Sequence, residues 1–324
     1  MKCENVKYEK IPLLLVDNGN GLRVYFSAMG ASLYSIYYDN ELMTLTPTHM
    51  KDFLRDNIYN GKTIGPVCGR IKDGQINIDD LIFEYEKNEG NNTLHSGKSG
   101  LSNTIFSKKI YNTPNLFSIM FSFTNKEKIG KEKRITKYFI TYVITSDNRI
   151  IISYKVTSNK PIVLSLTNNV YFTLGESNIE KLKMRISADS FVEFDKDDLT
   201  PLSYHKIIPC LDFNYLSPLT KEINNPYLIE HKTKGIDHFF LFNKDNKQII
   251  LESNKYRLTI KTNLNGVQIY TDNYSDNVEM LRTINSDRRG VAIEPQDSPL
   301  ERKIYCRDLK DIYDKEIEYQ FERK

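Results

Sequence analysis

Four short polar stretches of the 324-residue sequence carry side chains that could take part in chemistry. Arg70 lies in GPVCGRIKDG, His95 in NEGNNTLHSGKSGLS, Asp237 in KGIDHFFLF and Glu294 in GVAIEPQDSPL. A positioned carboxylate can act as a general base, and imidazole is the side chain best suited to give up a proton near neutral pH. Each residue lies beside a predicted strand end, where loops on a rigid sheet tend to carry function.

Each of these residues also has an ordinary structural interpretation when it is considered alone. Arg70 is typical of a surface salt bridge, and His95 of a structural loop histidine. Asp237 is typical of a turn or cap, because aspartate favours such sites, and Glu294 before a proline is typical of a solvated strand end. No single one of these residues, considered alone, indicates a functional site.

Common catalytic and metal-binding motifs are missing from the sequence. There is no HExxH pair, no GxSxG nucleophile elbow and no GxxxxGK[ST] phosphate loop. The four cysteines form no CxxC pair, which is typical of a reducing compartment without a disulfide framework. We therefore expect neither a metal nor a cofactor.

The charge balance and the hydropathy exclude several classes of partner. Lys plus Arg total 45 against 42 for Asp plus Glu, which gives a formal charge of +3. This near balance offers no reason to expect nucleic acid or a membrane surface as a partner. The apolar run near the N-terminus is too short for a signal peptide, and no segment approaches the roughly 18 apolar residues of a membrane span. We expect a cytoplasmic protein, and the sequence leaves its oligomeric state open.

The elements that must position these side chains are predicted to be strands. GLRVYFS and YRLTIKT alternate apolar with polar residues, and turn residues at Asp79–Asp80 and at 146–148 indicate hairpins. The lysine-rich stretch 124–137 is expected to be a solvated loop or hairpin tip, and 49–61 is the best helical candidate. The pattern predicts an all-β fold, a large antiparallel β-sandwich with few short helices, forming one domain over residues 1–324. The strand order is not fixed by the spacing.

The stretch LSLTNNVYFTL (164–174) places two adjacent asparagines inside a strand-like run. Asparagine is depleted in strands, so the run either ends in a turn or directs its amides into a polar pocket. The second interpretation predicts that Asn168 and Asn169 both face the pocket, with Tyr171 and Phe172 behind or beside it.

Six of the stretches, taken in order, resemble motifs of the aldose 1-epimerase (galactose mutarotase) family. They are GPVCGRI, NTLHSG, LTNNVYFTL, GIDHFFL, GVQIYTDN and VAIEPQ, and they span about Gly61 to Pro299. The resemblance implies a galactose mutarotase-like supersandwich. It also implies an isomerase that interconverts the α and β anomers of a hexose by acid–base ring opening, without a cofactor or metal.

The resemblance also implies roles for individual residues. Arg70 and Asp237 would contact sugar hydroxyls, and His95 would lie against the sugar near its anomeric end. Glu294 would be the catalytic base that takes the proton of the C1 hydroxyl. Gln268, within GVQIYTDN, would also bind the monosaccharide.

The sequence departs from the family pattern at the position of the acid. The family usually has a second histidine there, and this sequence has Asn169, which we expect to hold the sugar. Gly69, Ser96 and Thr173 also differ from the residues that are common in the family. An asparagine amide donates a hydrogen bond but does not transfer a proton under these conditions.

Three explanations for the missing acid stay open. His95 could serve as the acid or as a polarising group, or His238 could supply the proton. Alternatively, no acid is present and the protein is a non-catalytic carbohydrate-binding or sugar-sensing protein.

A different sugar reaction, such as epimerisation of a sugar phosphate, would need a further cation near Arg70. Lys62, Lys72 and Arg282 are candidates for that cation by residue type only.

Overall fold

The computed structural model describes residues 1–114, 116–221, 223–230, 233–243, 245–274, 277–283, 286–306 and 312–324. Strands dominate these residues, and their pairings within the sheets are antiparallel. The two α-helices found there are α1 (Met50–Phe53) and α2 (Pro226–Glu230). None of the helices in the described ranges is long and apolar enough to cross a membrane. The prediction of an all-β antiparallel sandwich with few short helices is therefore confirmed.

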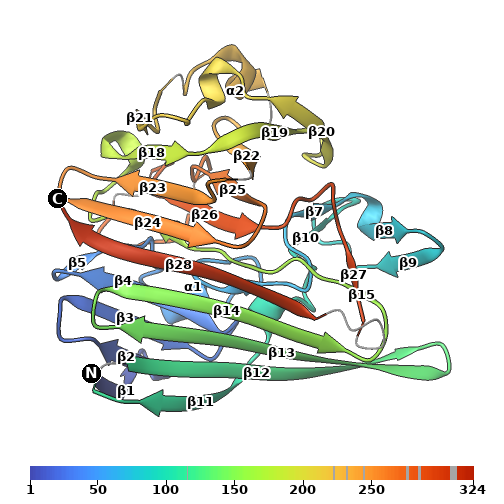
Figure 1. The fold of residues 1–324 in the computed structure, drawn as a ribbon, viewed down its shortest axis with the longest axis horizontal. Helices are drawn as coiled ribbons and strands as arrows, with labels where there is room; N and C mark the ends of the chain where they lie inside the picture. Colours follow the sequence, from blue (N-terminus) through green and yellow to red (C-terminus); the bar gives the residue numbers. More distant parts are fainter. Residues whose placement is uncertain are drawn as a thin grey trace.

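A nine-stranded sheet forms the front of the molecule in Figure 1. Its order is β11 (Ser107–Asn112), β12 (Leu116–Ile129), β13 (Glu132–Thr145), β14 (Arg149–Ser158), β28 (Tyr313–Arg323), β24 (Tyr256–Thr262), β23 (Gln248–Glu252), β18 (Lys183–Ile186) and β21 (Ser217–Pro218). Along β13 the residues alternate, so that Tyr138, Ile140 and Tyr142 are buried and their neighbours are partly exposed. Successive strand side chains point to opposite faces, so this alternation gives the sheet one apolar face.

A six-stranded sheet carries most of the residues that matter for function. Its order is β17 (Tyr171–Phe172), β26 (Val291–Gln296), β25 (Gly266–Tyr270), β22 (Asp237–Phe242), β19 (Ala188–Phe194) and β20 (Pro201–Lys206). All six residues of β26 are buried. Val291 and Ile293 join the main apolar core, and the alternate residues face the other way.

The remaining strands form one larger sheet and four pairs. The five-stranded sheet runs β1 (Lys2–Tyr8), β2 (Ile11–Asp17), β3 (Leu22–Ser27), β4 (Ser32–Tyr38) and β5 (Glu41–Leu42). The pairs are β6 (Thr63–Ile64) with β16 (Thr167–Asn168), β7 (Arg70–Ile71) with β10 (Thr93–Leu94), β8 (Gln75–Ile78) with β9 (Leu81–Glu84), and β15 (Ile162–Val163) with β27 (Ile304–Tyr305). Short 3₁₀ turns span Lys72–Gly74, Leu101–Asn103, Ile179–Lys181 and Pro209–Leu211.

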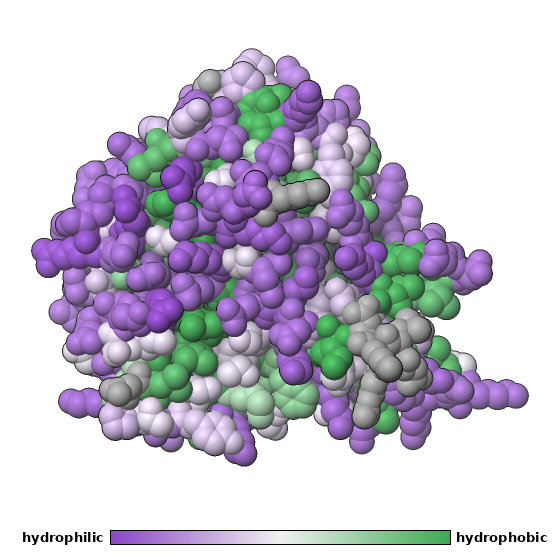
Figure 2. Space-filling model, in the orientation of Figure 1, coloured by the Kyte–Doolittle hydropathy of each residue, from purple (hydrophilic) through white to green (hydrophobic). Residues whose placement is uncertain are grey.

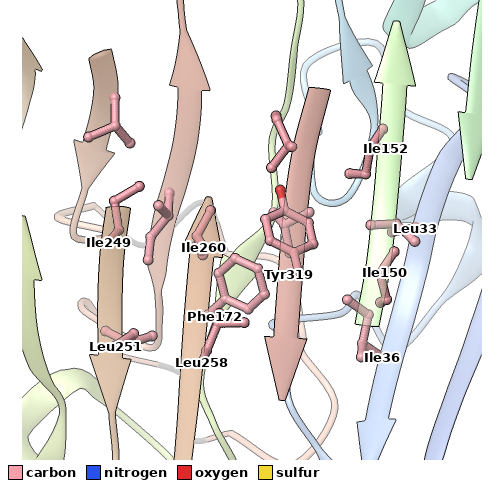
Figure 3. Close-up of a cluster of buried hydrophobic side chains, with 14 of the residues drawn as sticks. Leu33, Ile36, Ile150, Ile152, Phe172, Ile249, Leu251, Leu258, Ile260 and Tyr319 are labelled. Atoms are coloured by element: carbon pink, nitrogen blue, oxygen red, sulfur yellow. The ribbon is translucent and has the colours of Figure 1, made fainter. Parts of the chain in front are cut away.

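The core lies between the sheets. Figure 3 shows Leu33 and Ile36 of β4 beside Ile150 and Ile152 of β14. Phe172 packs edge-on against Tyr319 of β28, with ring centroids 5.3 Å apart. Figure 2, in the orientation of Figure 1, shows a mainly hydrophilic surface with apolar side chains only in scattered places. The alternation along the strands thus separates an apolar interior from a polar exterior.

Most of the local predictions agree with the structure. The hairpins expected at Asp79–Asp80 and at 146–148 are β8–β9 and β13–β14. The lysine-rich stretch 124–137 forms the tip of the β12–β13 hairpin, with its turn at residues 130–131. Of the helical candidate 49–61, only α1 is an α-helix. Its Met50 and Phe53 pack into a small apolar cluster with Leu13 and Tyr34.

Candidate active site

The register of the six-stranded sheet brings three of the expected site residues to one face. Gln268 of β25 lies directly opposite Glu294 of β26, and Asp237 of β22 lies opposite Tyr270 of β25. Residues two apart on a strand share a face, so Asp237, Gln268 and Glu294 project from the same side. Tyr171 of β17 pairs with Ala292 and joins this face.

A second structural unit brings in Arg70 and His95. Arg70 on β7 pairs with Leu94 on β10, and His95 follows β10 directly. The backbone then turns in the left-handed region at His95 (φ 54°) and Ser96 (φ 66°). The backbone of Gly69 (φ 72°) donates its N–H to Nδ1 of His95 at 3.2 Å, and its carbonyl accepts the N–H of His95 at 3.1 Å. This reciprocal contact fixes the imidazole beside the arginine.

The two asparagines at the end of β16 point in different directions. Asn169 lines the cavity described below. Asn168 is fully buried, and its amide donates to the carbonyl of Gly61 and to the hydroxyl of Tyr142, both at 3.2 Å. The expectation that both amides face the pocket is wrong for Asn168, because adjacent residues of an extended chain face opposite sides. Likewise, Tyr171 lines the cavity, whereas Phe172 points into the core.

All six expected site residues line one cavity of about 240 Å³. Its polar lining includes Arg70, His95, Asn169, Asp237, Gln268, Glu294 and Gln296, and its aromatic lining includes Tyr59, Tyr171, Phe194, Tyr270 and Tyr274. A concave site with aromatic walls and a few convergent polar groups is typical of small-molecule binding. These residues come from six separate strands and the loops beside them.

A charged network occupies one side of the cavity. Arg70 contacts Glu89 through Nε at 2.7 Å and Asp237 through Nη1 at 3.5 Å. Gln268 donates its Nε2 to the other carboxyl oxygen of Asp237 at 2.6 Å. Burial raises the pKa of Asp237, and the charge of Arg70 opposes that rise. The network holds the guanidinium, carboxyl and amide groups in fixed positions around the cavity.

The surroundings of His95 keep its imidazole neutral. Burial, followed by the charge of Arg70, lowers the pKa of His95 to about 3. Since Nδ1 accepts the N–H of Gly69, the neutral ring carries its hydrogen on Nε2. Tyr59 packs edge-on against the ring, with centroids 4.7 Å apart. His95 can therefore donate a hydrogen bond, but it holds no additional proton near neutral pH.

Glu294 lies deep in the cavity and is only 4% exposed. Its Oε2 is buried and makes no hydrogen bond within the described residues. Burial, and then the charge of Asp237, raise the pKa of its carboxyl to about 8, while Arg70 opposes the rise. A carboxyl with these surroundings is a candidate for proton transfer, because strongly perturbed groups in a cleft often mark functional sites.

Four other candidates lie outside the cavity. His238 is buried among Phe191, Phe194 and Tyr227, and its Nδ1 accepts the N–H of Asp237. Lys62 is buried with its ammonium on the carbonyl of Arg55, Lys72 lies in the 3₁₀ turn after β7, and Arg282 contacts Glu41. None of these four side chains lines the cavity, as far as the described residues define it.

The comparison with protein families matches nearly the whole chain. The model described as aldose 1-epimerase matches residues 12–305. The chain belongs to the aldose 1-epimerase family.

Relatives in this family are distant in sequence but match this chain over most of their length. An aldose 1-epimerase of Haemophilus influenzae is 25% identical over 303 residues, which are 89% of this chain and 86% of that protein. A galactose mutarotase of Sus scrofa is also 25% identical and covers 77% of this chain and 73% of its own length. Galactose 1-epimerase from Lactobacillus acidophilus superposes with a TM-score of 0.86 at 22% identity, covering 99% of both chains. That superposition shows that the two proteins share a fold.

Several residues in or beside the cavity were not predicted from the sequence. Gln296 could have been found, because it lies two residues after Glu294 on the same strand and so shares its face. Glu89, which contacts Arg70, and Tyr59, which contacts His95, carry no local pattern that marks them. Their positions follow only from how the loops fold over the sheet.

Proposed function

We propose that this protein is an aldose 1-epimerase that interconverts the α and β anomers of a hexose. Ring opening needs the proton of the C1 hydroxyl to be removed and the ring oxygen to be protonated. Glu294 takes the hydroxyl proton, and the Nε2 hydrogen of His95 polarises the sugar oxygen that it faces. Arg70, Asn169, Asp237 and Gln268 hold the sugar hydroxyls.

The observation that carries this proposal is the convergence of residues remote in sequence. Arg70, His95, Asn169, Asp237, Gln268 and Glu294 line one cavity. Guanidinium, carboxylate and amide groups match the donors and acceptors of sugar hydroxyls. The aromatic walls match the apolar C–H faces of a pyranose. The family membership of the chain supports the same reaction.

Between the two roles considered for His95, the geometry favours polarisation. A neutral imidazole whose Nδ1 is occupied by the Gly69 N–H has one hydrogen to share, and losing it would leave an unstable anion. His238 is not favoured as the acid, since it does not line the cavity.

A non-catalytic sugar-binding protein is the second candidate function. The observation in its favour is Asn169, an amide at the position where the family usually has its acid histidine. A sugar phosphate is less favoured, because Lys62, Lys72 and Arg282 all lie away from the cavity lining.

Polarimetry with freshly dissolved α-galactose and α-glucose tests the proposal. We expect the wild-type protein to accelerate the decay of optical rotation. Glu294→Gln should reduce that acceleration by about 10²–10⁴-fold, because it removes a positioned proton-transfer group. Glu84→Gln, an exposed carboxylate on β9, is the matched control and should retain full activity.

Calorimetric titration of the same sugars distinguishes the two functions. Binding by the wild-type protein without any acceleration would overturn the enzyme proposal and support the sugar-binding protein. An absence of both binding and acceleration over a panel of hexoses would overturn both.

A further inference from the structure

The cavity raises the question of which group protonates the ring oxygen. Asn169 occupies the position of the usual acid and transfers no proton. His95 is neutral, with Nδ1 occupied by Gly69, and His238 lies outside the cavity.

The four tyrosines that line the cavity are poor acids. Burial raises the pKa of each of them, and for Tyr59 the value reaches about 12. A tyrosine with a raised pKa gives up its proton less readily than a free phenol, and a donor works best with a pKa near the working pH. Asp237 also lines the cavity, but Arg70 contacts one of its carboxyl oxygens and Gln268 donates to the other. Among the described residues that line the cavity, this leaves the Glu294 carboxyl as the group with an available proton.

We propose that Glu294 acts in its protonated form and carries out both proton transfers of ring opening. This inference rests on the proposed function and assigns a single carboxyl to the roles that the family usually divides between two residues. The geometry behind it is a deeply buried carboxyl whose Oε2 has no hydrogen-bond partner in the described part of the chain.

The chemical step balances within one cyclic arrangement. One carboxyl oxygen gives its proton to the ring oxygen O5, and the other takes the proton from the hydroxyl oxygen O1. The electron pair of the O1–H bond becomes the second C1–O1 bond, and the pair of the C1–O5 bond moves onto O5. The products are an open-chain aldehyde and the same carboxylic acid, with its proton now on the other oxygen. After rotation about C1–C2, the reverse step closes the ring on the opposite face.

The match between catalyst and substrate is geometric. O1 and O5 are bonded to one carbon of the sugar, and the two carboxyl oxygens are bonded to one carbon of the side chain. The pairs can therefore meet face to face, and no separate relay has to reset the enzyme. Gln268 lies opposite Glu294 on the neighbouring strand, and it donates its amide to Asp237. Within the described residues, Oε2 of Glu294 is therefore available for this contact.

The surroundings of Glu294 favour the neutral acid. Burial is the main cause. Five titratable or charged groups lie near Glu294 on the elements around it, namely Asp237 on β22, Arg70 on β7, Tyr171 on β17, Tyr319 on β28 and Cys68 before β7. Of these, Asp237 opposes ionisation of Glu294, whereas Arg70 favours it. Arg70 is engaged by two other carboxylates, Glu89 and Asp237.

The pH dependence of kcat/KM separates this inference from a mechanism with an ionised base. If the active form is protonated, kcat/KM is constant below about pH 8 and falls about tenfold per pH unit above it, because kcat/KM reports the groups of the free enzyme. If the active form is the carboxylate, kcat/KM instead rises up to about pH 8.

The test is NMR exchange spectroscopy of the galactose and glucose anomers between pH 5 and 9.5. Rates are extrapolated to zero buffer concentration, because buffer acids and bases also catalyse mutarotation. A plateau followed by an alkaline fall supports the inference. A rise with pH, or a bell-shaped profile, overturns it while leaving the proposed function intact. No acceleration at any pH overturns the proposed function itself.

Variants at Asn169 make the same test sharper. Asn169→His adds an imidazole beside Glu294, so ionised Glu294 can work with a separate acid, and the profile should become bell-shaped. Asn169→Gln adds no titrating group and should retain the plateau and the alkaline fall, whatever its rate. An alkaline fall that is absent from the Asn169→Gln profile would overturn the inference.

A variant at His95 tests whether the imidazole is the titrating group. His95→Asn replaces the ring by an amide that can still donate a hydrogen bond. We expect a loss of about tenfold, the value of one hydrogen bond, with the shape of the pH profile unchanged. Disappearance of the alkaline fall in His95→Asn would identify His95 as the titrating group and overturn the inference.

Discussion

Two buried carboxylates on neighbouring segments have opposite surroundings. Asp272 follows β25 and contacts Arg289, which donates its Nε at 2.9 Å and its backbone N–H at 3.2 Å. Arg289 is 1% exposed and also donates Nη1 to the carbonyl of Val278 at 2.9 Å. Glu294 lies five residues after Arg289 and is as buried as Asp272, but its Oε2 has no hydrogen-bond partner among the described residues.

This difference in hydrogen bonding distinguishes a carboxylate that stabilises the fold, Asp272, from one that is suited to proton transfer, Glu294. A buried ion pair whose hydrogen bonds are satisfied holds two segments together, and breaking it leaves a costly charge. A buried carboxyl without a partner reduces stability, and such violations are expected at functional sites. Asn169 and Gln296, which also line this cavity, each have a buried side-chain oxygen without a hydrogen-bond partner in the described ranges. The cavity therefore concentrates polar groups that a substrate could satisfy.

The largest expected effect is on the structural side of this comparison. Arg289→Met should lower the free energy of unfolding by about 3–5 kcal/mol, because it removes the guanidinium that forms a buried ion pair with Asp272. Urea unfolding followed by circular dichroism measures the change. Lys155→Met is the control, since Lys155 forms an exposed pair with Asp314 and should cost less than about 1 kcal/mol. Equal costs for the two variants would show that the Asp272–Arg289 pair does not stabilise the fold.

The fold could be predicted from the sequence because its strands are amphipathic. YRLTIKT becomes β24 with the alternate residues Tyr256, Leu258 and Ile260 buried. The order of the sheets could not be predicted. For example, β28 lies between β14 and β24, which are about a hundred residues apart, and no local pattern encodes such a pairing. Figure 1 shows β28 in the middle of the front sheet, between β14 and β24.

The sequence predicted which residues form the site, but not the contacts that they make with one another. The six expected residues share a cavity, whereas Asn168 points into the core because β16 alternates like any strand. The neutral state of His95 depends on its burial and on the nearby charge of Arg70, and both follow from tertiary packing. The sequence likewise does not indicate that Oε2 of Glu294 has no hydrogen-bond partner in the described part of the chain, because this depends on how the neighbouring strands pack around it.

A smaller effect on the free energy of unfolding is expected from the Glu294 carboxyl, and this effect depends on pH. The folded pKa of Glu294, about 8, is raised above the ordinary 4.5, so its contribution to stability is fully present below about pH 4.5 and is lost as the pH rises through 8. Glu294→Gln does not titrate. The stability of Glu294→Gln relative to wild type should therefore increase by about 2 kcal/mol between pH 6 and pH 8 and stay level above that. Urea titrations at each pH measure this, and a flat difference would contradict a raised pKa.

The smallest effect concerns the backbone that orients His95. Gly69 has φ +72°, and a Cβ added there would meet only the Gln296 amide at 4.0 Å, so the cost of a side chain is conformational. Gly69→Ala should lower the free energy of unfolding by about 1 kcal/mol, and Gly69→Asn by less, because asparagine adopts the left-handed region more readily. Gly90→Ala is the matched control, since Gly90 has φ +61° and open space around it, and it should cost the same as Gly69→Ala. If Gly69→Ala and Gly69→Asn cost the same in urea unfolding, contacts in the cavity and not the backbone angle set the preference at this position.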